Sequence, residues 1–207
     1  MESQCSFLHE EALWFQGISR IAGIDEAGRG PLAGPVVAAA VIFVERLPVP
    51  GLDDSKKLTA ARRNQLYRFL TNQPGIEWAV AILEHTEIDR LNILAATHVA
   101  MTKAVAQLPA VDHALVDGLP VKGLPVPHTA LVRGDGCSLS IAAASVIAKV
   151  TRDRLMLDCH TVYPEYGFDR HKGYATADHL AKLKSHGPSP IHRRSFSPVA
   201  NCLPGLL

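Results

Sequence analysis

Short apolar runs, separated by residues that favour turns, recur along much of the chain. The runs at 21–24 and 36–44 are apolar throughout, and the second predicts a strand that is buried on both faces. Similar runs predict strands at 76–83, 114–116 and 129–132. The pattern therefore predicts a sheet of five strands.

Five other segments are predicted to be helices. They are 10–16, 59–71, 86–108, 138–157 and 176–185. We expect Thr86 to cap the long helix 86–108, and the small residues of Ile141–Ser145 to let helix 138–157 pack closely on the sheet. Because strands cluster first and helices then alternate with strands, the order favours an α/β fold with a mixed sheet and helices on both faces. From Gly187 onward, prolines at 188, 190, 198 and 204 predict an extended tail.

Composition narrows the class of protein. A chain of 207 residues that is 47% hydrophobic and 20% charged suits one sizeable globular domain and rules out a disordered or fibrous protein. The four cysteines are scattered with no CxxC pair, and the ten histidines show no zinc-ligand spacing. The longest apolar run, 35–44, is too short to span a membrane, and the acidic N-terminus lacks the basic region of a signal peptide. We therefore expect a cytoplasmic protein with reduced thiols and no membrane association.

Charge is distributed unevenly, although the net charge is only +1. Residues 1–148 hold 12 Lys and Arg against 15 Asp and Glu, whereas residues 149–207 hold 9 against 5. An acidic front half and a basic back half suit a site that holds metal ions on carboxylates beside a polyanion. Chance asymmetry of solvated surfaces explains the same counts.

Carboxylates follow three of the predicted strands: Asp25 and Glu26 after the first, Asp117 after 114–116 and Asp135 after 129–132. Each alone is compatible with an ordinary turn, and Asp-Gly at 117 and 135 is a common turn dipeptide. Together at the tips of adjacent strands they would repel one another, and a hard divalent cation would remove that penalty. Two such ions about 4 Å apart suit phosphodiester cleavage.

Two further segments carry candidate phosphate contacts. In the loop Gly28-Arg29-Gly30, the glycines let the backbone approach a ligand and Arg29 offers a planar fork of donors. The run Asp53-Asp54-Ser55-Lys56-Lys57 places Lys56 or Lys57 near a phosphate. A tight turn and a solvated charge run, respectively, are the alternatives.

Six motifs together resemble ribonuclease HII, the type 2 ribonuclease H family. They are GIDEAGRGPLAGPVVAAAV at 23–41, DDSKKL at 53–58, VDG at 116–118, GDG at 134–136, SIAAASVIAKVTRD at 140–153 and YPEYGFDRHKGY at 163–174. The resemblance runs from about 21 to 196 and implies a ribonuclease-H-like mixed five-stranded sheet flanked by helices, with a small helical C-terminal extension. It implies hydrolysis of RNA in RNA–DNA hybrids and incision 5′ of single ribonucleotides in duplex DNA, with two Mg²⁺ or Mn²⁺ ions, leaving 5′-phosphate and 3′-hydroxyl ends.

The resemblance also implies roles for particular residues. Asp25, Glu26, Asp117 and Asp135 correspond to the acidic metal ligands, and Gly28, Arg29 and Gly30 to the loop that senses the ribose 2′-hydroxyl. Tyr174 is the best match to the tyrosine that stacks on the sugar beyond the RNA–DNA junction, with Tyr163 and Tyr166 as alternatives.

Other residues are candidates for the substrate-binding surface. Ser145, Lys149 and Asp153 share one helix face, so Lys149 either reaches a phosphate or pairs with Asp153. The basic back half adds further residues that are expected to follow the DNA backbone: His171, Lys172, Arg193 and Arg194.

We expect residues 1–160 to form the catalytic domain, with a short N-terminal helix, and 161–207 to form the helical extension and proline-bearing tail. The expected partners are RNA–DNA hybrids and ribonucleotide-containing DNA, with no obligate protein partner and a monomeric state. Ribonuclease HIII, a related enzyme, normally carries an extra N-terminal substrate-binding domain, for which the residues before Asp25 leave no room. A DNA nuclease or transposase of the same fold is disfavoured by the glycine loop and the tyrosine-bearing segment 163–174, and a non-catalytic hybrid binder by the complete set of four acids.

Overall fold

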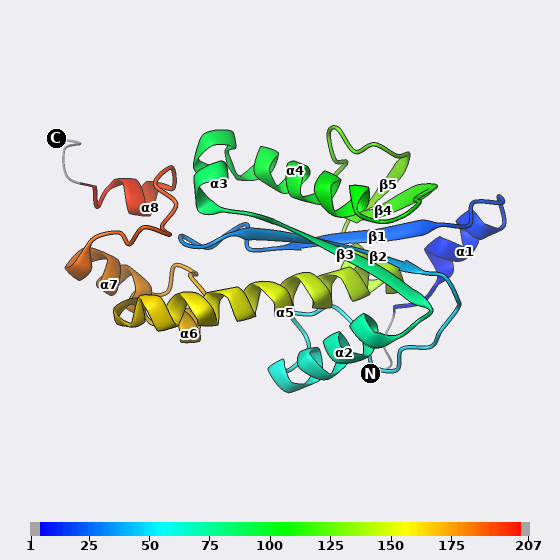
Figure 1. Ribbon diagram of the computed structural model, residues 1–207, viewed down its shortest axis with the longest axis horizontal. Coiled ribbons are helices and arrows are strands. Elements are labelled where there is room, and N and C mark those ends of the chain that lie inside the picture. The colour runs from blue at the N-terminus through cyan, green and yellow to red at the C-terminus, as the bar shows by residue number, and fades with distance from the viewer. Residues whose placement is uncertain (1–4, 204–207) are drawn as a thin grey trace.

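A computed structural model describes residues 5–203 of the chain (Figure 1). Its strands are β1 (Ile21–Ala27), β2 (Val36–Phe43), β3 (Ile76–Leu83), β4 (His113–Asp117) and β5 (His128–Leu131). Its α-helices are α1 (Leu8–Trp14), α2 (Ala60–Asn72), α3 (His85–Leu91), α4 (Ile93–Ala106), α5 (Leu139–Val162), α6 (Phe168–His171), α7 (Ala177–His186) and α8 (Ser197–Ala200). Two short 3₁₀ helices are η1 (Gly134–Gly136) and η2 (Pro164–Tyr166).

The five predicted strands form one mixed sheet in the order β3-β2-β1-β4-β5. β1 pairs antiparallel with β2, and β2 pairs antiparallel with β3. On its other side β1 pairs parallel with β4, and β4 pairs parallel with β5. The central strand therefore has a parallel neighbour whose carboxyl end lies at the same edge of the sheet as its own.

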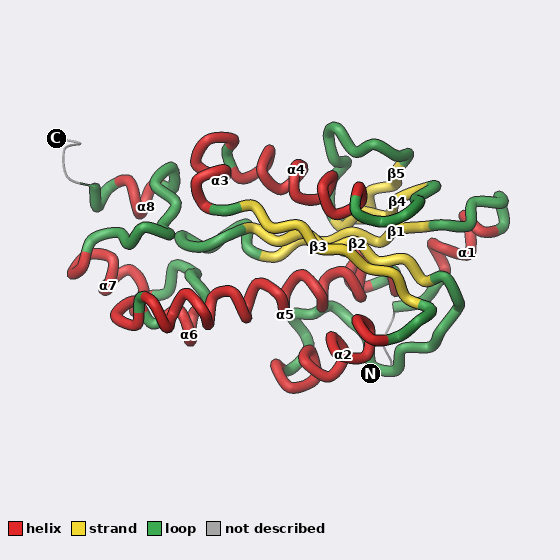
Figure 2. Tube along the Cα trace, in the orientation of Figure 1, coloured by secondary structure: helices red, strands yellow, loops and turns green. Residues whose placement is uncertain are grey.

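Helices cover both faces of the sheet, as Figures 1 and 2 show. On one face α3 and α4 pack on alternate residues of β1 and β2, including Ile24 and Ala38. On the other face α2 and α5 pack on the intervening residues of β2, including Val37 and Ala39. Because successive side chains of β2 point alternately into these two apolar layers, β2 is apolar at every position and fully buried.

α5 lies unusually close to β1, as its small residues predict. The side chains of Ala142, Ala143 and Ala144 are completely buried. Gly23 of β1 completes the fit, because a Cβ atom added there would lie 2.1 Å from the carbonyl carbon of Ser140. This close approach brings the side chains of α5 next to the end of β1.

The prediction of a single helix at 86–108 was wrong, because two helices meet at Asn92. Asn92 has a positive φ of 69°, which ends α3, and its side chain accepts a hydrogen bond from the Ala95 amide to cap α4. Thr86 lies inside α3 and is not its cap, since Glu84 takes that position. Apolar spacing alone continues smoothly across this break.

Other predicted boundaries also shift. β1 extends to Ala27, so Asp25 and Glu26 belong to the strand and not to the loop after it. α5 continues to Val162, beyond its predicted end at 157, and η2 and α6 lie in the segment before the next predicted helix, for which no helix was predicted. The expected extended tail contains α8, while Pro204 lies outside the described residues.

The elements after α5 gather at one end of the sheet (Figure 1). Phe168 and Tyr166 pack there against Met156 of α5 and Ala33 of the β1–β2 loop. All four cysteines are among the described residues and form no disulfide. Within 5–203, none of the helices combines the length and apolar character needed to cross a membrane.

Candidate active site

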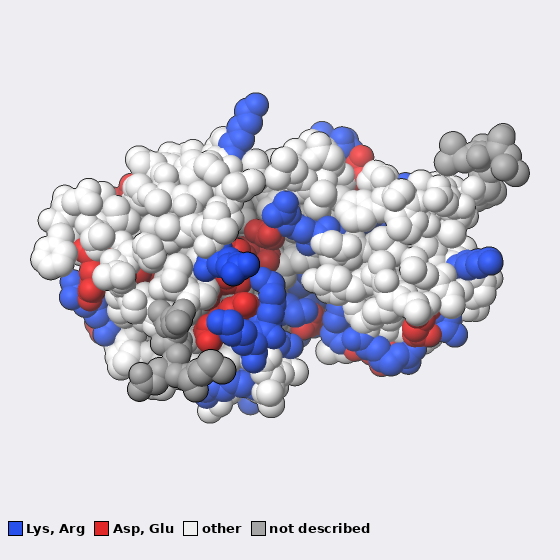
Figure 3. Space-filling view, turned by 180° about the vertical axis from the view of Figure 1, so that it is seen from behind, with Lys and Arg blue, Asp and Glu red and all other residues white. Residues whose placement is uncertain are grey.

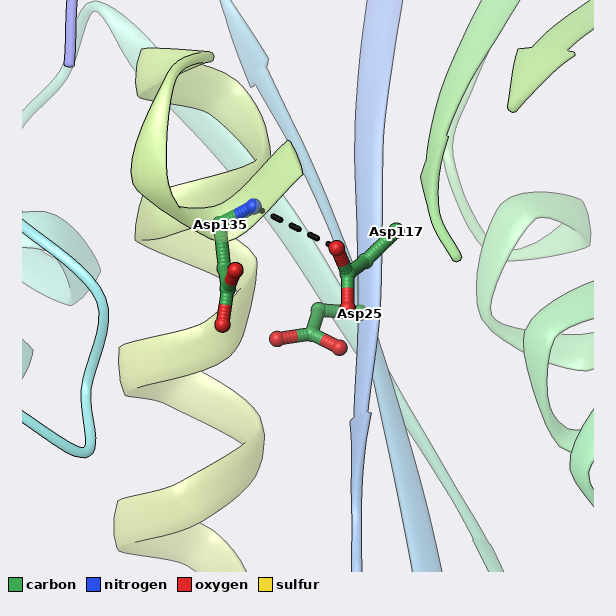
Figure 4. Close-up of side chains that lie close together, drawn as sticks. All are labelled: Asp25, Asp117 and Asp135. Atoms are coloured by element: carbon green, nitrogen blue, oxygen red, sulfur yellow. Dashed lines mark hydrogen bonds between the residues drawn. The ribbon is translucent and has the colours of Figure 1, made fainter. Parts of the chain in front are cut away.

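Three carboxylates come together at one end of the sheet. Asp25, Asp117 and Asp135 each offer an oxygen within 4.8 Å of the others. Figure 4 shows the three side chains pointing toward one another, with the Asp135 amide donating to Asp117 Oδ1 at 3.4 Å. The predicted convergence of strand-end acids is therefore present for three of the four residues.

The sheet topology explains this convergence. Ile24 of β1 lies opposite Val116 of β4, so Asp25 and Asp117 follow in register at the ends of parallel neighbours. Asp135 comes from η1, just after β5, which pairs with the other side of β4. Arg133 has a positive φ of 59° and turns the chain from β5 into η1.

Burial makes the group electrostatically unfavourable when no cation is bound. Asp25 is only 3% exposed, and its Oδ1 accepts a hydrogen bond from the Glu26 amide at 2.6 Å. Burial, together with the charges of Glu26 and Asp117, raises the pKa of Asp25 well above its ordinary value. Burial and the charge of Asp135 likewise raise the pKa of Asp117. A divalent cation would relieve the repulsion between the carboxylates and offset the cost of burying their charges.

Glu26 lies outside this group of three. Glu26 follows Asp25 directly in β1, but its carboxylate is not part of the group of oxygens that lie within 4.8 Å of one another. Its Oε1 lies 3.4 Å from Nη1 of Arg29, and it lines the same cavity as Asp25 and Asp117. Burial raises the pKa of Glu26, against the opposing effect of Arg29. The fourth expected ligand is therefore at the cavity wall and is engaged by the arginine of the glycine loop.

Lys56 is in direct contact with one of the three acids. Its Nζ lies 3.0 Å from Oδ2 of Asp135. Burial lowers the pKa of Lys56, but the hydrogen bond to Asp135 and the charges of Asp135, Asp25 and Asp54 outweigh it, and the pKa is raised. Lys57 points elsewhere, since its Nζ lies 3.0 Å from Oδ1 of Asp53 on an exposed surface. Only Lys56 of the two lines the cavity beside Asp25.

That cavity also holds the glycine loop and an aromatic ring. It has about 620 Å³ of empty volume, and its walls include Gly28, Arg29, Gly30 and Tyr174 along with the acids. Tyr174 is 43% exposed, with Lys149 Nζ lying 5.9 Å from its ring centroid. Tyr166 is buried, stacks on Phe168 and donates its hydroxyl to Gly187, so it belongs to the core. Tyr163 is partly buried against the same core cluster and does not line the cavity, so geometry favours Tyr174 among the three tyrosines.

Ser145 and Lys149 of α5 also line the cavity. The Ser145 hydroxyl lies 2.8 Å from the hydroxyl of Ser55, both are buried, and Ser145 also hydrogen-bonds to Asp25. Ser145 therefore ties the turn that carries Lys56 to α5 and orients Asp25. Lys149 Nζ donates to Asp153 Oδ1 at 2.7 Å, which is the pairing alternative of the sequence analysis.

Two buried arginines, which the sequence analysis did not identify as structural, hold the glycine loop from behind. Arg193 is 0% exposed and donates to five carbonyl oxygens, those of residues 28, 29, 31, 34 and 35. Arg152 donates to the carbonyls of Ala33, Pro35 and Lys172. Burial and the neighbouring Arg152 lower the pKa of Arg193 to about 9, so it stays charged at neutral pH.

The expectation that Arg193 and His171 follow the DNA backbone was therefore wrong. Both are buried. The His171 ring hydrogen-bonds within the fold, through Nε2 to the Tyr166 carbonyl and through Nδ1, which accepts from the Gly173 amide. Arg194 is exposed, and its backbone amide donates to Asp89. A run of basic residues near the C-terminus does not reveal which of them the fold turns inward.

Charge is concentrated around the acids on one face of the molecule. In Figure 3, acidic atoms lie in a hollow near the middle of this face, and Lys and Arg atoms surround them. A cluster of carboxylates within a basic rim suits a phosphate chain that is held by cations and cleaved where carboxylates bind metal ions.

Comparisons with known proteins agree with this geometry. The family model described as ribonuclease HII matches residues 22–199. A ribonuclease HII from Dechloromonas aromatica is 55% identical over 187 residues, which cover 90% of this chain and 95% of the relative. One from Desulfitobacterium hafniense is 53% identical over 191 residues, covering 92% and 73%. The crystal structure of ribonuclease H2 from Pyrococcus horikoshii is similar at a TM-score of 0.74 and 28% identity, covering 88% of this chain and 96% of that one.

Proposed function

The chain belongs to the ribonuclease HII family of endoribonucleases that degrade RNA–DNA hybrids, and we propose that it also incises duplex DNA 5′ of a single embedded ribonucleotide. The observation that carries the proposal is one cavity that joins the acids, the glycine loop and Tyr174. The acids supply a place for phosphodiester hydrolysis, and the loop and ring supply a place to recognise the sugar beside it.

Two divalent cations, Mg²⁺ or Mn²⁺, fit the donor set. Asp25, Asp117 and Asp135 offer hard oxygen ligands within 4.8 Å of one another, and Glu26 lines the same cavity. We propose that these four residues hold both ions. Bound ions of this kind lower the pKa of an attacking water and stabilise the leaving oxygen.

The basic residues then act on the substrate. When cations neutralise Asp135, Lys56 loses its nearer carboxylate partner, keeps only Asp54 at 3.9 Å, and becomes available to a phosphate next to the cleaved bond. Arg29 would be released from Glu26 in the same way, and its side chain is about half exposed. Ser145 keeps Asp25 oriented through its buried hydroxyl. These side chains position the phosphate over the acids, and positioning is one of the two main contributions that a protein makes to phosphoryl transfer.

The glycine loop is built to read the ribose 2′-hydroxyl. Arg193 engages the carbonyls of Gly28 and Arg29 from inside the protein. The amides of Arg29 and Gly30 donate to no residue in the range 5–203 and lie at the cavity. A 2′-hydroxyl can accept from such an amide, whereas a deoxyribose leaves it unpaired, at a cost of about 1–3 kcal/mol for each lost bond.

A gel assay on three matched duplexes tests the proposal. The duplexes are all DNA, DNA with one ribonucleotide, and DNA with a tract of four ribonucleotides, each incubated with Mg²⁺ or Mn²⁺. We expect cleavage 5′ of the single ribonucleotide and within the tract, ending in 5′-phosphate and 3′-hydroxyl, and no cleavage of all-DNA. Asp117→Asn should abolish cleavage, while Asp158→Asn, at an exposed acid of α5, should not. Equal cutting of the all-DNA and one-ribonucleotide duplexes would rule out sensing of the 2′-hydroxyl.

A further inference from the structure

A second cavity opens on the other side of the acidic group. It has about 1100 Å³ of empty volume and is lined by Lys57, Arg133 and Cys137, among others. It shares Asp117 and Lys56 with the cavity of the glycine loop. The two cavities therefore meet at the proposed position of the cleaved phosphate, one on each side.

Arg133 is the cation in this second cavity whose side chain the described structure leaves without a partner. Lys56 pairs with Asp135 and Lys57 with Asp53, but the Arg133 guanidinium has no hydrogen bond or ion pair to any of residues 5–203. Its side chain is exposed, and its carbonyl accepts from the Gly136 amide at 3.1 Å. An unpaired guanidinium at the edge of a cavity is suited to bind a phosphate.

The backbone fixes Arg133 relative to the acids. Its positive φ of 59° is a conformation that a non-glycine residue adopts infrequently, and it leads directly into the turn that places Asp135 beside Asp117. Arg133 is thus two residues from one proposed metal ligand and on a turn that cannot be rearranged without moving it. The backbone from which the Arg133 side chain extends therefore has a defined position relative to the acids.

A nucleic acid strand must continue on both sides of the phosphate that is cleaved. In the proposed function, the glycine loop and Tyr174 hold the ribonucleotide and the sugar that follows it, which are the 3′ side of the cut. The second cavity is left for the 5′ side. We propose that Arg133, assisted by Lys57, binds a backbone phosphate of the cleaved strand on the 5′ side of the cut, and thereby holds the part that leaves with the 3′-hydroxyl. This inference rests on the proposed function.

The experiment combines a variant with substrates that lack single charges. Duplexes with one ribonucleotide carry a neutral methylphosphonate at one of the first three phosphates on the 5′ side of the cut, at matched positions on the 3′ side, or in the opposite strand. Wild type, Arg133→Gln, Arg133→Lys and Lys57→Gln are compared. The control is Arg68→Gln, which alters an exposed arginine on α2, away from both cavities.

We expect Arg133→Gln to raise KM about 10-fold and to change kcat less. The slope of log KM against log salt should fall by the amount that corresponds to about one lost phosphate contact. Arg133→Lys should recover part of the loss, Lys57→Gln should show a smaller rise in KM, and Arg68→Gln should match wild type. One 5′ methylphosphonate should cost wild type the same factor and cost Arg133→Gln nothing further, because the same contact is already absent.

Two results would overturn the assignment. One is equal KM values for Arg133→Gln and wild type when both have the same melting temperature. The other concerns the rise in KM caused by Arg133→Gln. The assignment fails if this rise adds to that of every 5′ methylphosphonate, or if it is instead non-additive with a methylphosphonate on the 3′ side or in the opposite strand. Wild-type protein that does not cut at the ribonucleotide would instead contradict the proposed function, so the two failures are distinguishable.

Discussion

The guanidinium of Arg193 donates to the carbonyl oxygen of Gly28 at 2.6 Å, across 165 residues of sequence. This contact joins the C-terminal segment to the loop beside the acids. Because Arg193 also binds four other carbonyls of residues 29–35, the loop is fixed from its buried side. The C-terminal elements therefore shape the cavity, although they contribute none of the acids.

Arg193→Lys should weaken both stability and activity. A lysine keeps the charge but has one ammonium group, which cannot reach five carbonyls that a planar guanidinium spans. We expect a loss of about 2–4 kcal/mol in the free energy of unfolding, measured with urea. We also expect cleavage of the single-ribonucleotide duplex to fall at least about 10-fold at a temperature where the variant is folded. Arg194→Lys is the matched control, and equal effects of the two substitutions would contradict this role of Arg193.

Gly28 and Gly30 should respond differently to alanine. Gly28 has a φ of +99°, and a Cβ there would lie 2.1 Å from Nε of Arg152 and 2.7 Å from the Pro35 carbonyl oxygen. Gly28→Ala should therefore lower the melting temperature and remove activity together. At Gly30 the nearest atom to a new Cβ is Cε1 of Tyr174, at 3.7 Å, so Gly30→Ala should fold normally. Thermal denaturation of the two variants checks this, and a destabilised Gly30→Ala would show that the loop is less tolerant than its geometry indicates.

Local sequence was sufficient to predict the sheet and the acids for a physical reason. Each acid lies at or just after the end of an apolar run that predicts a strand, and parallel neighbours then bring Asp25 and Asp117 to the same edge. The break at Asn92 was missed because its cause is one residue with a positive φ inside an otherwise regular apolar pattern. The inward orientation of Arg193 was missed because its carbonyl partners are more than 150 residues away. The pairing of Glu26 with Arg29 depends on side-chain position, which strand periodicity does not specify.

Histidine protonation should destabilise the protein below neutral pH. The Nε2 atoms of His179 and His192 lie 3.0 Å apart, so at least one ring must be neutral for this hydrogen bond. Burial, together with the nearby His179, lowers the pKa of His192 to about 3. Below its unfolded pKa of about 6.5, the unfolded chain binds a proton that the folded protein does not, so stability falls as pH falls.

Urea unfolding at several pH values measures this effect. Between pH 6.5 and pH 4, His192 should reduce the free energy of unfolding of wild type by roughly 3 kcal/mol. His192→Gln should be less stable at pH 7.5 but should lose less stability across that range. The comparison is made between the two proteins at each pH, because carboxylates titrate in both. Parallel stability profiles would mean that His192 is not the group responsible.

Divalent cations should stabilise the wild-type protein. The raised pKa values of Asp25 and Asp117 reflect burial and mutual repulsion, which oppose folding at neutral pH when the acids are ionised. Millimolar Mn²⁺ should raise the melting temperature by binding to the native state. Asp25→Asn should raise the melting temperature in EDTA and reduce the response to Mn²⁺, while Asp158→Asn should change neither. A clustered metal site would be contradicted if the wild-type melting temperature were the same in EDTA and in about 10 mM Mn²⁺.

Tyr174 should position the sugar without anchoring the duplex. Its exposed ring lies in the cavity beside Gly30, and contact between an aromatic ring and a nucleotide is worth about 1–3 kcal/mol. If that contact is made as the reaction proceeds, Tyr174→Ala should lower kcat on a single ribonucleotide about 10- to 100-fold, with a smaller change in duplex affinity. Tyr174→Phe keeps the ring and should remain close to wild type. A duplex in which a second ribonucleotide follows the one at the cut site should show a smaller loss, because a deoxyribose packs more closely against the ring than a ribose does. Single-turnover cleavage and a binding titration in Ca²⁺ separate the two quantities, and equal losses in kcat and affinity would indicate that the ring anchors the duplex.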